Sequence, residues 1–204
     1  MIDSEYNKFV TKMSNLFNSY NGKERVILGQ SPFPDGKNIV CNNGRFKQVA
    51  FLRSVPPDNA KTEKTVNRIW HLLFGDKAQN VRDLLDAIQC SKATATKEEY
   101  LAKYLTEEQK FYLINAFEDR DCKIITEDLK NLNADVECRE ILIVGKEALC
   151  GIKYLSKNEI KFIMHPSARG LNKETVAKQW DSFSHKGTGI YNSSDEIINV
   201  FQIK

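Results

Sequence analysis

The sequence predicts an α/β fold, a three-layer α/β/α sandwich around a central, mainly parallel four-stranded sheet. Four short apolar runs, rich in branched side chains, indicate buried strands at residues 25–28, 111–114, 140–144 and 160–164. Segments with helical periodicity alternate with these runs, which favours helices on both faces of a parallel sheet. The length of 204 residues, 41% of them hydrophobic, suits a single domain over residues 1–204 with its own core.

The N-terminal part predicts a helix, a strand and a loop. Apolar residues recur at helical spacing over residues 4–20, with Ser4 as the N-cap. The β-branched run 25–28 ends at Gly29, as expected of a buried strand. Proline, glycine and asparagine are frequent over residues 30–44, which predicts a loop leaving that strand.

Two amphipathic helices are predicted next, around residues 66–73 and 81–88, and Gly75 ends the first of them. The stretch 91–110 has a polar, helical pattern, and we expect it to be an exposed insertion. Residues 122–125 are predicted to form an additional edge strand.

The C-terminal half continues the alternation of strand and helix. The strand at 140–144 ends at Gly145 and is followed by a helix around residues 148–152. After the last strand, residues 175–183 have helical periodicity, and residues 184–204 show no clear pattern.

Composition narrows the class of protein and its location. A net charge of +3 neither requires nor excludes nucleic acid, because a DNA-binding face can be basic on a protein of modest net charge. No apolar run is long enough to span a bilayer, and the first residues lack the pattern of a signal peptide. The five cysteines form no C-x-x-C pair, and the three histidines are scattered. We therefore expect a cytoplasmic protein with reduced cysteines and no metal or cofactor.

Polar residues begin the loops that follow three of the strands. Gln30, Asn115 and His165 stand at these points, and open parallel sheets bind their ligands beyond the carboxyl ends of the strands. Taken singly, each has an ordinary structural interpretation, since asparagine often forms turns and a histidine before proline is often structural. Their order and spacing favour a functional interpretation.

Four segments resemble, in the same order, the motifs of the uracil-DNA glycosylase superfamily. Residues 26–34, V-I-L-G-Q-S-P-F-P, resemble its G-Q-D-P-Y-H motif, and residues 111–116, F-Y-L-I-N-A, resemble its L-L-L-N segment. Residues 141–148, I-L-I-V-G-K-E-A, are similar to the strand, glycine and helix that precede its last motif. Residues 165–170, H-P-S-A-R-G, are similar to its H-P-S-x-L/R segment. The resemblance covers residues 25–183 in patches and implies DNA as the partner.

The resemblance implies roles for the residues at these strand ends. Such enzymes extrude a nucleotide from the DNA stack and bind its base in a pocket. Asn115 would pair with the edge of the base, because its amide offers an acceptor and two donors in one plane. His165 would donate a hydrogen bond to the base oxygen on which negative charge develops. Gln30 would also contact the base.

Contacts with the DNA backbone are implied for Pro32 and Ser167. Arg169 occupies the position from which the family inserts a wedge into the duplex, and in this residue the chain resembles the single-strand-selective branch. An ordinary solvated arginine is the alternative for Arg169.

The chain departs from the family at the catalytic acid. Ser31 stands in place of the aspartate that orients water and stabilises the sugar cation. Ser31 would position the water, or Asp35 in the same loop would supply the carboxylate. Turn formation in Pro34-Asp35-Gly36 is the ordinary alternative for Asp35.

The pocket residues also differ from those of uracil enzymes. Phe33 and Pro34 replace the tyrosine and histidine of the first motif, and Asn42 and Asn43 align with the segment that carries the stacking phenylalanine. An amide in place of an aromatic ring weakens stacking, which is worth about 1–3 kcal/mol per base, and adds hydrogen-bonding capacity. This pattern favours a modified pyrimidine, such as a hypermodified cytosine of phage DNA, over plain uracil.

We therefore predict a monomeric, monofunctional DNA glycosylase that leaves abasic sites and acts in antiviral defence. The alternatives are a uracil-excising DNA repair enzyme, a catalytically inactive DNA-binding member of the superfamily, and an unrelated α/β enzyme acting on nucleotides. An assay for DNA binding and for strand breaks at abasic sites would distinguish them. Breaks would indicate a glycosylase, binding without breaks an inactive member, and neither result an unrelated enzyme.

Overall fold

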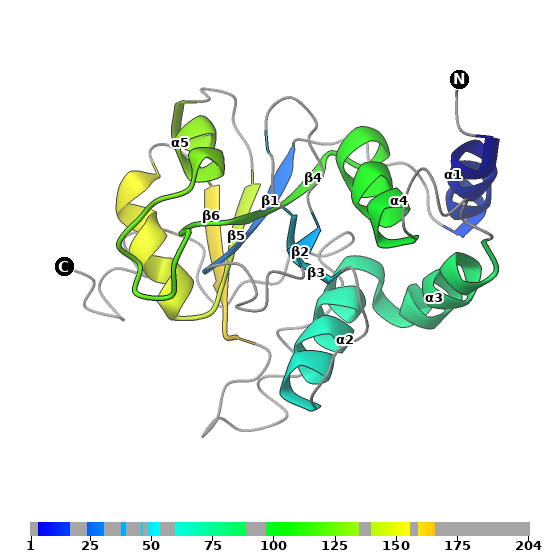
Figure 1. The fold of residues 1–204 in the computed structure, drawn as a ribbon, viewed down its shortest axis with the longest axis horizontal. Helices are drawn as coiled ribbons and strands as arrows, with labels where there is room; N and C mark the ends of the chain where they lie inside the picture. The colour runs from blue at the N-terminus through cyan, green and yellow to red at the C-terminus, as the bar shows by residue number, and fades with distance from the viewer. Residues whose placement is uncertain are drawn as a thin grey trace.

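The computed structural model describes residues 4–16, 24–30, 38–39, 46, 49–53, 60–88, 97–134, 140–155 and 159–165 (Figure 1). The predicted helix at 175–183 and the segment 184–204 lie outside these residues. Within the described ranges, no helix combines the length and the apolar character that a bilayer-spanning helix requires.

Four parallel strands form the central sheet, in the order β4-β1-β5-β6. They are β1 (Arg25–Gly29), β4 (Phe111–Asn115), β5 (Glu140–Val144) and β6 (Glu159–Ile163). The register aligns their carboxyl ends, because Gly29 lies opposite Asn115 and Val144 lies opposite Ile163. The predicted fold class, with its mainly parallel four-stranded sheet, is confirmed.

Helices cover both faces of this sheet (Figure 1). They are α1 (Ser4–Leu16), α2 (Ala60–Phe74), α3 (Ala78–Asp86), α4 (Lys97–Lys103) and α5 (Glu127–Ala134), with the 3₁₀ helices η1 (Gly75–Lys77) and η3 (Glu147–Tyr154) and the π-helical turn η2 (Tyr104–Glu108). One face packs against α1 to α4, and the other against α5 and η3. The chain moves outward from β1 to β4 and then returns across β1 to β5, and crossovers of the usual right-handed sense would place helices on both faces in this way.

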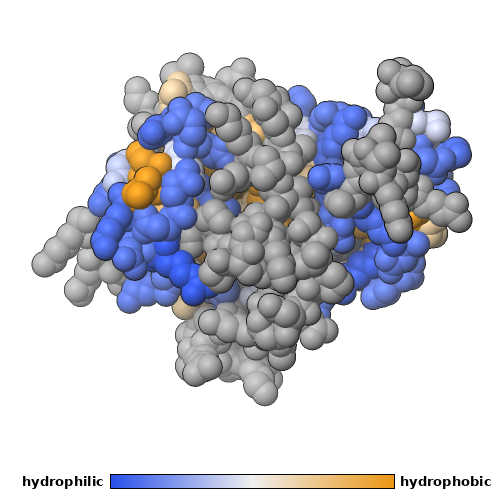
Figure 2. All heavy atoms as spheres, viewed as in Figure 1, coloured by the Kyte–Doolittle hydropathy of each residue, from blue (hydrophilic) through white to orange (hydrophobic). Residues whose placement is uncertain are grey.

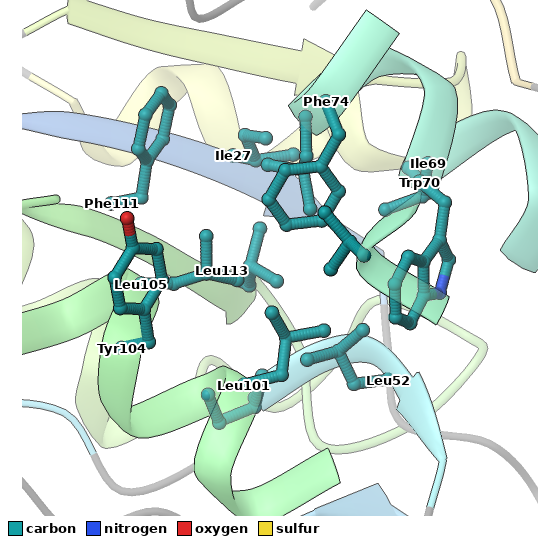
Figure 3. Close-up of a cluster of buried hydrophobic side chains, with 14 of the residues drawn as sticks. Ile27, Leu52, Ile69, Trp70, Phe74, Leu101, Tyr104, Leu105, Phe111 and Leu113 are labelled. Atoms are coloured by element: carbon teal, nitrogen blue, oxygen red, sulfur yellow. The ribbon is translucent and has the colours of Figure 1, made fainter. Parts of the chain in front are cut away.

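The strands bury side chains on both faces of the sheet. Ile27 and Leu113 belong to the core between the sheet and α1 to α4, part of which is drawn in Figure 3. The next residues along each strand, Leu28 and Ile114, belong to the opposite core beneath α5 and η3. A sheet covered on both faces needs apolar residues at successive positions, which explains the continuous apolar runs in the sequence.

The stretch predicted as an exposed polar insertion is part of the core where it is described, so that prediction was wrong. Helix α4 and the turn η2 bury Tyr100, Leu101, Tyr104 and Leu105 against the sheet and α1. The charged side chains between them lie at the surface. These charged residues make the average composition of residues 91–110 polar, so the buried apolar face of the helix is difficult to recognise in the sequence.

Two local predictions were also wrong. The segment 122–125 forms no strand beyond an isolated bridge between Phe117 and Ile125, because its backbone N–H groups bond to a side-chain carboxylate instead. The loop expected after β1 contains β2 (Asn38–Ile39), which pairs antiparallel with β3 (Val49–Arg53). The helix expected after β5 is present and has the 3₁₀ form (η3). Both β3 and α5 were missed.

Burial of Tyr104 makes stability depend on pH in the alkaline range. Its hydroxyl accepts a hydrogen bond from Gln109 Nε2 at 2.8 Å, and its ring packs edge-on against Phe9. Burial raises the pKa of Tyr104 from 10.0 to about 12, because the core disfavours the charged phenolate. Since the folded-state pKa is the higher one, this stabilisation is complete below pH 10 and is lost as the pH rises from 10 to about 12.

We expect Tyr104→Phe to make the free energy of unfolding less dependent on pH in this alkaline range. A pKa shift of one unit corresponds to about 1.4 kcal/mol, and solvent screening reduces the effect. As the pH rises from 10 to about 12, the free energy of unfolding of the wild-type protein should therefore fall by about 1–2 kcal/mol more than that of the variant. Urea unfolding of both proteins below pH 10 and near pH 12 measures the difference. Parallel stability curves for the two proteins would contradict the assignment.

Candidate functional site

The residues that the sequence singles out lie at the carboxyl ends of the strands, with Asn115 at the end of one outer strand and His165 after the other. Gly29 ends β1, Asn115 ends β4, Gly145 follows β5, and His165 lies two residues beyond β6. The connections that leave β1 and β5 run to opposite faces of the sheet, so a topological switch point lies between these two strands. In open α/β sheets, ligands bind in the crevice at such a point.

Asn115 is held rigidly and is almost fully buried. Thr126 Oγ1 donates a hydrogen bond to its carbonyl at 2.6 Å, and the next residue's N–H donates to Gly29 O at 2.9 Å. Its side chain is buried, with 3% of the residue exposed, and Nδ2 has no hydrogen-bond partner among the described residues. An unsatisfied buried amide costs about 1–3 kcal/mol, so this donor calls for an acceptor.

An aromatic ring lies beside this amide. A Cβ atom on Gly29 would lie 2.7 Å from Cζ of Phe51 and 3.2 Å from Oδ1 of Asn115, so the ring and the amide both cover the end of β1. Phe51, in β3, has a φ of 65°, a left-handed conformation that is strained for a bulky side chain. Such strain is found preferentially at functional sites. We therefore add Phe51, which the sequence analysis had not included, to the candidate site.

Gly29 is required by this arrangement, because any side chain there meets the Phe51 ring. We expect Gly29→Ala to displace the ring and the Asn115 amide, with a loss of about 1–3 kcal/mol in the free energy of unfolding. Urea unfolding measures this loss. If the ring is the obstacle, the same substitution should cost clearly less in a Phe51→Ala background. An equal cost in both backgrounds would place the strain elsewhere.

His165 covers the end of the other central strand. Gly145 has a φ of 92°, and a Cβ atom there would lie 3.0 Å from Cβ and 3.2 Å from Cδ2 of His165. The imidazole thus lies against the end of β5, as the Asn115 amide lies against the end of β1. Neighbouring strands are about 4.8 Å apart, so side chains that cover both ends can contact one small planar ligand. Joint action on one base stays a prediction.

Gln30 has a different environment from the one predicted for a base-binding side chain. Its side-chain Nε2 donates a hydrogen bond to Arg120 O at 2.7 Å and lies 3.7 Å from Cys122 Sγ. Its backbone carbonyl oxygen accepts a hydrogen bond from Phe117 N at 2.8 Å. These bonds tie the exit of β1 to the loop after β4. A contact of Gln30 with a base stays a prediction.

The loop after β4 is built around one carboxylate. Asp119 accepts hydrogen bonds from the backbone N–H groups of Lys123 at 3.3 Å and Ile124 at 2.9 Å. Desolvation raises the pKa of Asp119, but these backbone bonds outweigh it and hold the pKa below its ordinary value. Ile124 is 60% exposed, and the view in Figure 2 shows an otherwise largely hydrophilic described surface with a small hydrophobic patch.

The remaining predicted site residues lie outside the described residues, and their roles stay predictions. They are Ser31, Pro32, Phe33, Asp35, Asn42, Asn43, Ser167 and Arg169. In the part of the chain that is described, no three His, Cys, Asp or Glu side chains are grouped as metal ligands would be. The site is therefore characterised here by the Asn115 amide, the Phe51 ring and the His165 imidazole. No family model matches the chain, and no curated protein matches it.

Proposed function

We propose that this protein is a monofunctional DNA glycosylase that binds an extruded base at the carboxyl edge of the sheet. The observation that carries the proposal is the Asn115 amide, which is buried and whose Nδ2 lacks a partner among the described residues. A nucleobase edge offers an acceptor for this donor and a donor for the neighbouring Oδ1. A base is therefore a ligand of matching chemistry.

The ring of Phe51 supports a flat ligand. It lies beside the Asn115 amide over Gly29, which leaves room for no side chain at that position. A base that pairs with the amide can stack on this ring, and such stacking contributes about 1–3 kcal/mol. Extrusion of the base from DNA costs a few kcal/mol, which these two contacts help to offset.

His165 is proposed as the donor to the leaving base. Hydrolysis of the N-glycosidic bond transfers the bonding electrons to the base, and a fixed N–H directed at its oxygen stabilises that charge. The water that attacks the sugar would be positioned by Ser31 or activated by Asp35. This assignment rests on the motif resemblance of the first loop.

The proposed substrate is a pyrimidine, and a modified one is preferred. This preference rests on Phe33 and Pro34 in the first motif and on Asn42 in the predicted stacking position. Phe51 supplies an aromatic face that the sequence analysis had not included. Weak stacking is therefore no longer a reason to exclude plain uracil, and both substrates belong in the test. Modified phage DNA would place the enzyme in antiviral defence.

The test is an abasic-site assay. The purified chain is incubated with oligonucleotides carrying uracil or hydroxymethyluracil and with phage DNA that contains modified cytosine, and alkali then cleaves any abasic sites. We expect strand breaks with at least one substrate. The double variant Asn115→Ala, His165→Ala, purified in the same way, should give none and so controls for contaminating glycosylases.

One observation favours a second candidate, a catalytically inactive DNA-binding protein. Ser31 occupies the position at which the resembling family has its aspartate. Binding of these DNAs without breaks would support this candidate and overturn the enzymatic proposal. Neither binding nor breaks would overturn both and favour an α/β enzyme of another class.

A further inference from the structure

Two cysteine residues from different elements lie near each other, and one of them, Cys122, lies beside the side chain of Gln30. Cys122 is in the loop after β4 and Cys150 is in η3, and both are free thiols. The thiol of Cys122 lies 3.7 Å from the carbonyl oxygen of Glu147. Residues three apart eclipse each other in a 3₁₀ helix, so Cys150 lies on the same side of η3 as Glu147. Burial raises the pKa of the Cys122 thiol, and the neighbouring Cys150 thiol adds to this rise, as expected of two thiols that lie near each other.

The surroundings of this pair suit oxidation. Cys150 is exposed, so a small oxidant reaches it, and Cys122 is half-buried behind it. A disulfide requires the two sulfur atoms to come to a bond length of about 2.05 Å, which needs a local adjustment of one partner. Cys122 has a φ of 57°, and this left-handed residue belongs to a loop rather than to the sheet, so its adjustment leaves the strand ladders intact.

We propose that Cys122 and Cys150 form a redox-sensitive dithiol that small disulfides such as oxidised glutathione convert to an intramolecular disulfide. The thiolate of Cys150 attacks one sulfur of oxidised glutathione and releases one reduced glutathione. The thiolate of Cys122 then attacks the Cys150 sulfur of the mixed disulfide and releases the second. The two cysteines lose two electrons and two protons in total, and the oxidant gains both.

Closure of the disulfide changes what holds the loop after β4. The Cys122 sulfur moves toward η3 and away from Gln30 Nε2, which keeps its 2.7 Å bond to Arg120 O. The loop becomes covalently joined to the 3₁₀ helix that packs on the same face of the sheet. The proposal concerns this pair alone and does not depend on glycosylase activity.

The test maps the disulfide in the full chain. Folded protein is incubated with oxidised glutathione, free thiols are alkylated, and disulfide-linked peptides are identified by mass spectrometry. We expect a peptide pair that links Cys122 with Cys150, and the loss of both of these thiols from alkylation. The oxidised protein should also unfold at a higher urea concentration, and reduction should reverse the shift.

Matched serine variants distinguish the pair from the other cysteines. Cys122→Ser should accumulate a glutathione adduct on Cys150, and in Cys150→Ser the thiol of Cys122 should stay free, because the partly buried Cys122 is not attacked first. The proposal is overturned if Cys122 and Cys150 are recovered fully alkylated after oxidation. A bridge from either residue to Cys41, Cys90 or Cys138 would overturn it equally.

Discussion

Replacement of Asn115 by alanine is expected to lower the rate of base release about 100-fold or more while the protein stays folded. The substitution removes a preorganised donor and acceptor from the proposed pocket, and loss of one such donor typically costs a factor of about 100–1000 in rate. Single-turnover cleavage of the best substrate from the abasic-site assay measures the effect. This measurement follows once the abasic-site assay has identified a substrate that the wild-type chain cleaves.

The stability of this variant separates a functional role from a structural one. Truncation of a buried side chain normally destabilises a protein by leaving a cavity. Here it also removes the buried Nδ2 that has no partner among the described residues, which offsets part of that cost. We expect a change of less than about 1 kcal/mol in the free energy of unfolding.

Asn115→Asp is the matched control for donor chemistry. It keeps the shape of the side chain and replaces the Nδ2 donor by a second acceptor oxygen. Activity on a base that presents an oxygen to Nδ2 should fall as far as in Asn115→Ala. Wild-type activity in Asn115→Asp would show that Nδ2 donates nothing to the substrate.

The second large effect concerns stability. Glu140→Gln should lower the free energy of unfolding by about 3 kcal/mol, because it removes the negative charge that pairs with two nearly buried cations. Glu140 Oε2 lies 3.3 Å from Nε of Arg25, and its other oxygen pairs with Nζ of Lys161. These residues come from β5, β1 and β6, so the cluster joins three of the four strands.

An exposed pair supplies the matched control for this substitution. Glu5 and Lys8 form an ion pair of 2.7 Å on the surface of α1, where solvent screens the interaction. Glu5→Gln should change stability by less than about 0.5 kcal/mol. Urea unfolding at neutral pH measures both variants. Losses of similar size would show that the Glu140 cluster is as well solvated as the surface pair.

The sequence alone was sufficient to predict the strands of the sheet and the end of the sheet at which the candidate site lies. Strands buried on both faces leave continuous apolar runs, and a glycine or polar residue marks the end of each run, as at Gly29 and Asn115. Parallel strands then bring their carboxyl ends to one edge whatever their order. For this reason Asn115 and His165 were predicted to lie at the same end of the strands, the carboxyl end.

The missed features depend on contacts between distant segments. Phe51 matters because its ring covers Gly29, and β3 itself is a short strand whose pairing with β2 leaves no periodic pattern. Burial of Tyr104 depends on α1 packing against it through Phe9. The contact of Cys122 with the carbonyl oxygen of Glu147 likewise joins a loop to a helix that lies beyond another strand.

The order of the strands also constrains how the chain can be made. The first strand, β1, is hydrogen-bonded on both sides to strands that are synthesised much later, β4 and β5. Until these emerge from the ribosome, both backbone edges of β1 lack their native partners, and such edges are prone to pair with other chains. Folding during translation is therefore expected to wait for β5, and nascent chains that stop short of it should need chaperones to stay soluble.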